Sequence, residues 1–162
     1  MAVYFYLSLS QIFKKMKKFT RLFAINGVIM VLMLSIPSFA QEKEAVLEVI
    51  ESAYVKGFQN LGGREMMENG FHPTFVMVLN RGGQLSDLPL ARMIEIVEQR
   101  LANPDYTHIP VEAKILDVDV TGNAAMVKLE LYREGNKLFT DYLGLYKFED
   151  GWKIFNKLYH QH

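Results

Sequence analysis

The period of the hydrophobic pattern changes along this chain from helical to extended, and that change limits the fold more than any other feature. Residues 42–61 place apolar side chains three and four positions apart, as the buried stripe of one helix does. From Thr107 onward, apolar and polar residues alternate through four segments, as strands do. These segments are residues 111–120, 125–131, 138–148 and 152–159. The pattern predicts an α+β domain with three N-terminal helices packed on one face of a curved antiparallel sheet.

The region between the first helix and Thr107 supplies the remaining predicted elements. Residues 64–69 predict a short helix that Gly70 closes in a left-handed conformation. Residues 71–80 predict a strand, followed by an Arg-Gly-Gly hairpin turn at 81–83. Residues 90–101 predict a third helix, which Asn103-Pro104 stops. The strand of residues 111–120 loses its alternation after Ile115, and this slip predicts a β-bulge.

The first 40 residues resemble a targeting segment rather than part of the domain. Basic residues from Met16 are followed by an apolar run at 22–36 and by small residues up to Ala40, which predicts a secretory signal at 16–40 with cleavage after Ala40. Residues 1–15 precede this second Met and predict nothing. We expect an exported domain, residues 41–162, in the periplasm or outside the cell. The alternative is an uncleaved anchor, because the run approaches the roughly 20 residues that span a bilayer.

Charge and composition argue against several classes of function. Five of the 18 basic residues and none of the 18 acidic ones precede Gln41, so the exported domain carries 13 basic residues against 18 acidic ones, a net charge of about −5. Nucleic acids and anionic lipid surfaces both attract clustered Lys and Arg, so neither is an expected partner, and no stable membrane insertion is expected after cleavage. The chain has no Cys and four His residues, which predict neither a metal site nor a cofactor.

Four short motifs carry a resemblance to a known family. They are Asp-Val-Thr-Gly-Asn-Ala-Ala at 119–125, Phe-Thr-Asp-Tyr-Leu at 139–143, Gly-Trp-Lys-Ile at 151–154 and Asn-Lys at 156–157. With the order of elements, they resemble the nuclear transport factor 2-like superfamily and, within it, the family catalogued as putative lumazine-binding. The resemblance implies a cone of helices and sheet that can enclose a small ligand. The superfamily also includes ketosteroid isomerase, scytalone dehydratase and SnoaL-like cyclases, so it implies a catalytic alternative as well.

The resemblance to the isomerase assigns roles to individual positions. Tyr54 and Asp141 fall where that enzyme has the two donors of its oxyanion hole, while Leu79 falls where its catalytic base should lie. Without a base the cone can hold a carbonyl but cannot move a proton between carbons. His72 would be a substitute base in a lyase or isomerase. Asp141 shares a strand phase with Leu143, which favours a buried, neutral acid, and the alternative is a partly solvated Asp141 paired with a lysine.

The remaining candidate residues come from the predicted elements. Alternation along the last strand places Trp152 and Asn156 together on the floor of the cone, although a Trp at a strand start is commonly a core residue. Tyr54 has the simpler interpretation of a core aromatic, and His72 that of a helix cap. The candidate catalytic residues are Asp141, His72 and Tyr54. The candidate ligand-binding residues are Tyr54, Phe58, His72, Phe75, Asp141, Trp152 and Asn156.

Three functions are consistent with these observations. The first is an exported domain that binds a small, partly apolar molecule. The second is the lyase or isomerase. The third is a non-catalytic association module whose cone is filled by methionines 66, 77, 93 and 126. Residues 138–148 are apolar on both faces, and because one face would remain exposed in a monomer, we predict a homodimer through the sheet.

Overall fold

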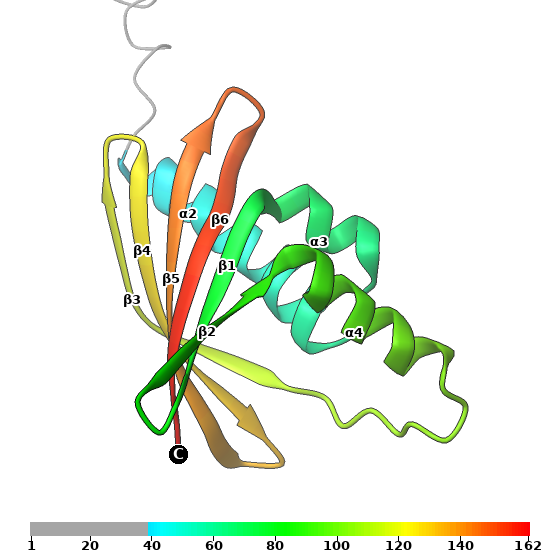
Figure 1. Ribbon diagram of the computed structural model, residues 1–162. Coiled ribbons are helices and arrows are strands. Elements are labelled where there is room, and N and C mark those ends of the chain that lie inside the picture. Colours follow the sequence, from blue (N-terminus) through cyan, green and yellow to red (C-terminus); the bar gives the residue numbers. More distant parts are fainter. Residues whose placement is uncertain (1–38) are drawn as a thin grey trace, which may run out of the picture. The chain divides into compact units, whose positions relative to one another are not determined.

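The computed structural model describes residues 39–162 (Figure 1), so residues 1–15 and the predicted signal up to Ser38 lie outside the described residues. The described chain opens with one continuous helix in two windings. Helix α2 (Phe39–Val49) is α-helical and passes directly into η1 (Ile50–Gln59), which is π-helical. The predicted helix of residues 42–61 is therefore present, but its wider second half has no counterpart in the predicted 3.6-residue period.

A short helix and a hairpin follow. They are α3 (Arg64–Gly70), β1 (Phe71–Arg81) and β2 (Gln84–Pro89), and α4 (Leu90–Ala102) comes after them. Both glycines of the hairpin turn have positive φ, as the turn prediction requires. Gly70 ends α3 as predicted, but for a different reason. It is not among the residues with positive φ, and a side chain there would collide with that of Ala53 in η1.

Four long strands complete the domain, in agreement with the sequence pattern. They are β3 (Glu112–Thr121), β4 (Ala124–Arg133), β5 (Asn136–Phe148) and β6 (Gly151–Gln161). The predicted bulge is confirmed, because the β3–β4 register shifts between Ile115 and Asp117. Among the described residues the strands form one sheet in the order β2-β1-β6-β5-β4-β3.

Two details of the predicted fold class need correction. The sheet is mixed, because β6 lies between β1 and β5 and runs parallel to β1. Alternation identifies strands but not their neighbours, so the sequence did not show this crossover. The helices are also not all N-terminal, because α4 follows the β1–β2 hairpin.

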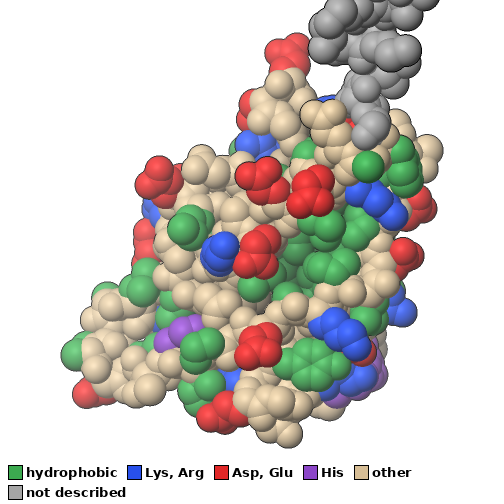
Figure 2. Space-filling view, turned by 180° about the vertical axis from the view of Figure 1, so that it is seen from behind, with side chains coloured by type: hydrophobic (Ala, Val, Ile, Leu, Met, Phe, Trp, Pro, Cys, Tyr) green, Lys and Arg blue, Asp and Glu red, His purple; other side chains and the backbone are tan. Residues whose placement is uncertain are grey.

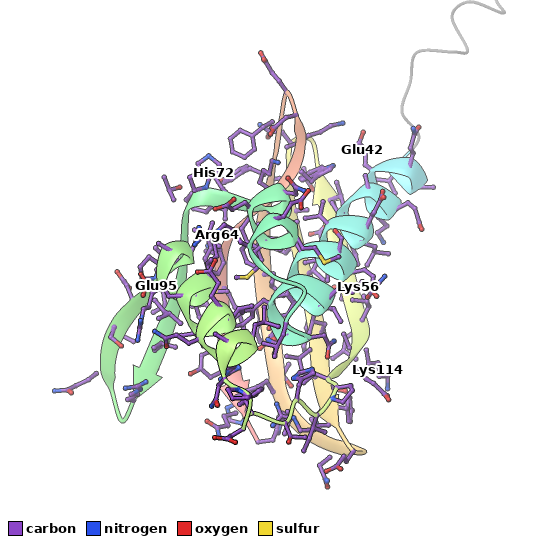
Figure 3. The ribbon with its side chains drawn as sticks, turned by 90° about the vertical axis from the view of Figure 1, so that its right-hand side faces the viewer. Glu42, Lys56, Arg64, His72, Glu95 and Lys114 are labelled. Carbon is purple, nitrogen blue, oxygen red and sulfur yellow. The ribbon has the colours of Figure 1, made fainter. Side chains whose placement is uncertain are left out.

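The helices cover one face of the sheet, which we call the inner face (Figures 1 and 3). Leu129, Leu143 and Ile154 are fully buried there, and each such side chain contributes roughly 1.5–3 kcal/mol relative to exposure. Figure 2 views the helix-covered side, where acidic and basic side chains are scattered over the surface. The opposite face of the sheet, the outer face, exposes Met126 and Tyr146.

None of the described helices combines the length and the apolar character that crossing a membrane requires.

Candidate functional site

Four polar side chains meet between η1 and the inner face, and we call them the buried polar cluster. Tyr54 and Gln59 come from η1, Asp141 from β5 and Lys157 from β6. Asp141 and Tyr54 are 0% exposed and Lys157 is 3% exposed. On the β5–β6 ladder Asp141 lies opposite Tyr159 and Lys157 opposite Leu143, so the two charged residues are diagonal neighbours. The structure therefore brings Tyr54 and Asp141 together, and it adds Lys157.

The Tyr54 hydroxyl is the centre of the cluster. It donates a short hydrogen bond to Asp141 Oδ2. It accepts one hydrogen bond from Lys157 Nζ at 2.6 Å and another from Gln59 Nε2 at 2.8 Å. A phenol has one proton and two lone pairs, so these three contacts use its full capacity. Tyr54 therefore has no proton left to donate to a substrate oxygen.

Asp141 and Lys157 retain unused capacity. Lys157 Nζ lies 3.1 Å from Asp141 Oδ1, which is an ion-pair distance. The two atoms are out of line for a hydrogen bond, and Oδ1 has no hydrogen-bond partner among the described residues. An ammonium group has three N–H donors, of which Tyr54 receives one. The cluster is thus closed around Tyr54 but unsaturated at Lys157 and at one oxygen of Asp141.

Burial shapes the electrostatics of the cluster. It raises the pKa of Tyr54 well above its usual value, and the nearby negative charge of Asp141 raises it further. Burial also lowers the pKa of Lys157, although Asp141 opposes this by favouring the charged amine. Perturbed ionisable groups that gather in one place are typical of functional sites. As a source of stability they are poor, because desolvation cancels much of the attraction.

Aromatic rings surround Lys157. Its Nζ lies 5.0 Å from the ring centre of Tyr54, 5.1 Å from that of Tyr159 and 5.9 Å from that of Phe139, within the range of cation–π attraction. The ring of Phe58 packs against Tyr54 at 6.1 Å. Phe58, Phe139 and Tyr159 are only partly buried, so these rings lie between the buried amine and the surface.

The π winding positions Gln59. In a π-helix the backbone hydrogen bond joins residues five apart, and the Asn60 N–H donates to the Val55 carbonyl at 2.9 Å in that pattern. Gln59 lies five residues after Tyr54, so the same winding brings its amide over the Tyr54 hydroxyl. Sequence reasoning missed Gln59, because the apolar spacing of this segment looks like that of an ordinary α-helix.

A bulge in β6 explains why sequence reasoning also missed Lys157. Gly144 pairs with Asn156 but Leu145 pairs with Ile154, so the ladder skips Phe155. Phe155 and Asn156 are both exposed, and Lys157 points inward. The predicted floor of Trp152 with Asn156 is therefore wrong, because strict alternation does not survive the extra residue. The available signal was a lysine one strand away from a predicted buried carboxylate.

The other candidate residues lie away from the cluster. His72 lies at the start of β1 (Figure 3) and is bound locally, with Nδ1 2.7 Å from Thr74 Oγ1 and its ring stacked on Phe148 at 4.8 Å. Trp152 is a buried residue whose Nε1 donates to Glu42 Oε2 at 2.9 Å, which joins α2 to the sheet.

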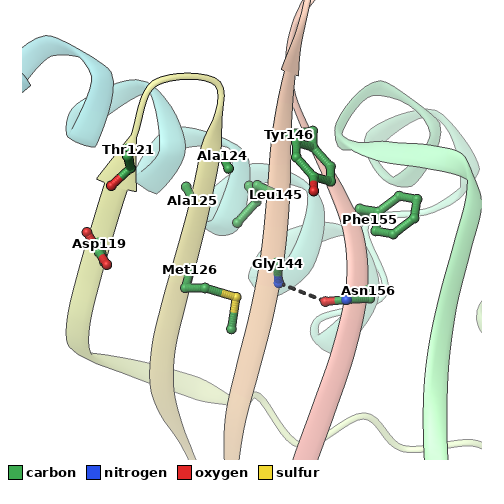
Figure 4. Close-up of a pocket in the computed structure, with 10 residues that line it drawn as sticks. All are labelled: Asp119, Thr121, Ala124, Ala125, Met126, Gly144, Leu145, Tyr146, Phe155 and Asn156. Carbon is green, nitrogen blue, oxygen red and sulfur yellow. Dashed lines mark hydrogen bonds between the residues drawn. The ribbon is translucent and has the colours of Figure 1, made fainter.

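Phe75 and Leu79 belong to the inner face. Phe75 is 1% exposed and packs edge-to-face on Phe71 at 4.8 Å. Leu79, which the resemblance aligned with the isomerase's base, is a partly buried side chain against the core. Asn156 lines a groove on the outer face, which Figure 4 shows.

The arrangement can hold a ligand more readily than it can move a proton. The Tyr54 proton is committed to Asp141, the charge of Asp141 is paired with Lys157, and Leu79 cannot act as a base. In the part of the chain that the structure describes, no three His, Asp or Glu side chains gather as metal ligands would.

Several solved structures share this fold. A nuclear transport factor 2-like protein of unknown function from Shewanella baltica is 23% identical, covers 77% of this chain and 97% of its own, and superposes with a TM-score of 0.63. A similar protein from Silicibacter pomeroyi is 24% identical over 77% of this chain and 99% of its own, with a TM-score of 0.63. A third, from Methylobacillus flagellatus, is 23% identical over 74% and 90%, with a TM-score of 0.53.

These likenesses show the nuclear transport factor 2-like fold. No curated protein matches the chain. The family model described as "Putative lumazine-binding" matches residues 41–160. The chain therefore belongs to that family.

Proposed function

We propose that this chain binds a small, partly apolar molecule at the buried polar cluster, between η1 and the inner face of the sheet. The description of its family names the binding of lumazine, which supports a small-molecule ligand for this chain as well. The fold supplies a helix layer over a curved sheet, an arrangement that can enclose such a ligand.

The observation that carries the proposal is a buried ion pair with unused hydrogen-bonding capacity. Removing each ion from water costs several kcal/mol, and two apolar side chains of similar volume would pack at least as well. Lys157 nevertheless makes one hydrogen bond with three donors, and Asp141 Oδ1 makes none. A carbonyl or similar acceptor on a ligand would accept a hydrogen bond from an N–H of Lys157 that has no partner.

The rings around Lys157 supply the apolar part of the site. Phe139 and Tyr159 lie edge-to-face at 5.5 Å, and both are close to the Lys157 amine. A planar molecule entering past these partly buried rings would contact aromatic surface on its way to the amine. Binding then requires the rings to separate, since Tyr54, Asp141 and Lys157 are buried.

The geometry favours binding over the lyase or isomerase alternative. Both members of the expected oxyanion hole are engaged with one another and with Lys157. His72, the substitute base, contacts Thr74 and Phe148 instead. Export through residues 16–40 and a homodimer through the outer face stay predictions. Of the four methionines expected to fill the cone, Met77 and Met93 are buried, whereas Met66 and Met126 are exposed.

Native mass spectrometry of the full chain tests the proposal. The wild-type protein should carry an added small-molecule mass that denaturation releases. The double variant Asp141→Leu/Lys157→Met should lose that mass while keeping a native far-UV circular dichroism spectrum. Lys153→Met is the matched control, because Lys153 is also on β6 but pairs with Asp150 at 3.0 Å outside the cluster. A mass retained equally by the double variant would place the ligand elsewhere and refute the proposal.

A further inference from the structure

A groove crosses the outer face of the sheet, away from the buried polar cluster. It has a volume of about 320 Å³ and runs over strands β3, β4, β5 and β6 (Figure 4). One row of register partners forms its length, since Asp119 pairs with Met126, Met126 with Gly144, and Gly144 with Asn156. Gly144 has no side chain, and the side chains of Asn156 and Met126 lie close over its position in this row.

Asn156 is fixed at one end of the groove. Its Oδ1 accepts a hydrogen bond from the Gly144 N–H at 3.1 Å. A backbone N–H can only donate, so this contact settles which end of the amide is oxygen. A Cβ at position 144 would lie 2.6 Å from Oδ1, so the contact requires glycine. The Nδ2 of Asn156 has no hydrogen-bond partner among the described residues and remains a free donor at the groove.

The other end of the groove is acidic. Asp119 and Thr121 line it from β3, and neither side chain has a hydrogen-bond or ion-pair partner among the described residues. Tyr146 on β5 and Phe155 on β6 form an aromatic wall at the Asn156 end, with ring centres 5.7 Å apart (Figure 4). The Asn156 amide lies over Gly144 on β5, two strand spacings from β3, so the donor and the carboxylate are about 10 Å apart.

We propose that this groove binds a small aromatic cation about 10 Å long, with a carbonyl or amide acceptor at one end and a protonated amine at the other. The acceptor would bind Asn156 Nδ2, the ring would lie over Met126 of β4, between the two ends, and the amine would pair with Asp119. The predicted homodimer would use the same face. A second copy is the weaker occupant, because it would cover a carboxylate and an amide donor that lack partners.

The test uses the full chain and the probe 4-(2-aminoethyl)benzamide, which has an amide, a ring and an amine in that order. Isothermal titration should give binding that weakens at least tenfold in Asp119→Asn and in Asn156→Ala. The neutral analogue 4-ethylbenzamide should bind at least tenfold more weakly to the wild-type protein. Asp117→Asn is the matched control, because Asp117 is on the same strand but is the register partner of Lys128 and does not line the groove. Its affinity should equal that of the wild type.

Two results would overturn this proposal. One is equal binding of the charged and neutral probes, or binding that Asp119→Asn leaves unchanged, since either shows that the carboxylate recognises nothing. The other is a dimer in sedimentation that Met126→Glu dissociates and that fails to bind the probe, since a second copy would then be the occupant. Neither result bears on the buried polar cluster, so the two proposals fail independently.

Discussion

Replacing Lys157 by methionine should destabilise the protein by about 3–5 kcal/mol, because it leaves Asp141 buried without its countercharge. Asp141 is 0% exposed, so water cannot take the place of the lost amine. The charges are 3.1 Å apart, and at an effective dielectric constant of about 20 this separation corresponds to an attraction of about 5 kcal/mol. Asp141→Leu should cost a similar amount, because it strands the charge of Lys157.

The double variant Asp141→Leu/Lys157→Met should recover most of this loss. Neither charge remains to be buried, and the Tyr54 hydroxyl keeps its hydrogen bond from Gln59. The remaining cost is the loss of Asp141 as the acceptor of the buried Tyr54 proton, about 1–3 kcal/mol. Replacing a buried ion pair with apolar residues of similar volume is commonly neutral or stabilising by about 1–4 kcal/mol. The two single substitutions should therefore be far from additive.

Urea unfolding of the four proteins measures this coupling, with circular dichroism as the probe and unchanged m-values as the check on two-state behaviour. The exposed pair Arg92–Glu95, 2.7 Å apart on α4, is the matched control and should show little coupling. If the double variant lost as much stability as both single variants together, the charges would act independently. The account of the cluster as one unit would then be refuted.

Three further predictions follow from the helices and the cluster. Gly70→Ala should cost about 1–3 kcal/mol in urea unfolding, because the added methyl meets η1 where the helices are in contact; an unchanged midpoint would contradict the close packing. The pKa of Tyr54 is raised when folded, so its stabilisation is present below pH 10, the ordinary tyrosine value, and is lost as pH rises toward the folded pKa. The stability gap between wild type and Tyr54→Phe should accordingly narrow above pH 10 in a pH series of unfolding curves, and a constant gap would contradict this. Hydrogen bonds from Lys147 and then Trp152 lower the pKa of Glu42, so the stability that Glu42 contributes should be lost as pH falls through its lowered, folded-state pKa. Glu42→Gln should remove this loss of stability in acid, measured by unfolding curves at a series of low pH values. An unchanged acid transition would count against the contact of Glu42 with Lys147 and Trp152.

The fold could be predicted from periodicity because helical and extended patterns occupy separate parts of this chain. The bulge near Ile115 was visible because the apolar residues on both sides of the slip are regular. The parallel pairing of β1 with β6 was not visible, because pairing joins segments about 80 residues apart and leaves no local mark. The predicted end of the short helix at Gly70 was correct, but the predicted left-handed conformation of Gly70 was wrong.

Two of the four residues of the buried polar cluster were predicted from the sequence. Tyr54 and Asp141 were found because Tyr54 lies on the apolar stripe of the first helix and Asp141 shares the strand phase of Leu143, which is also buried. Lys157 was missed because the bulge at Phe155 reverses the phase of β6, and an exposed phenylalanine gives no local signal of a bulge. His72 was misplaced for a related reason, since its neighbour Phe71 takes the inner face and turns it outward.

The most direct test of the buried polar cluster as a ligand site is a crystal structure of the protein purified without denaturation, with its bound small molecule. Ligand density should lie within hydrogen-bonding distance of Lys157 Nζ, between the rings of Phe139 and Tyr159. Density at any other place, with the contacts among Tyr54, Asp141 and Lys157 unchanged from those described, would contradict it.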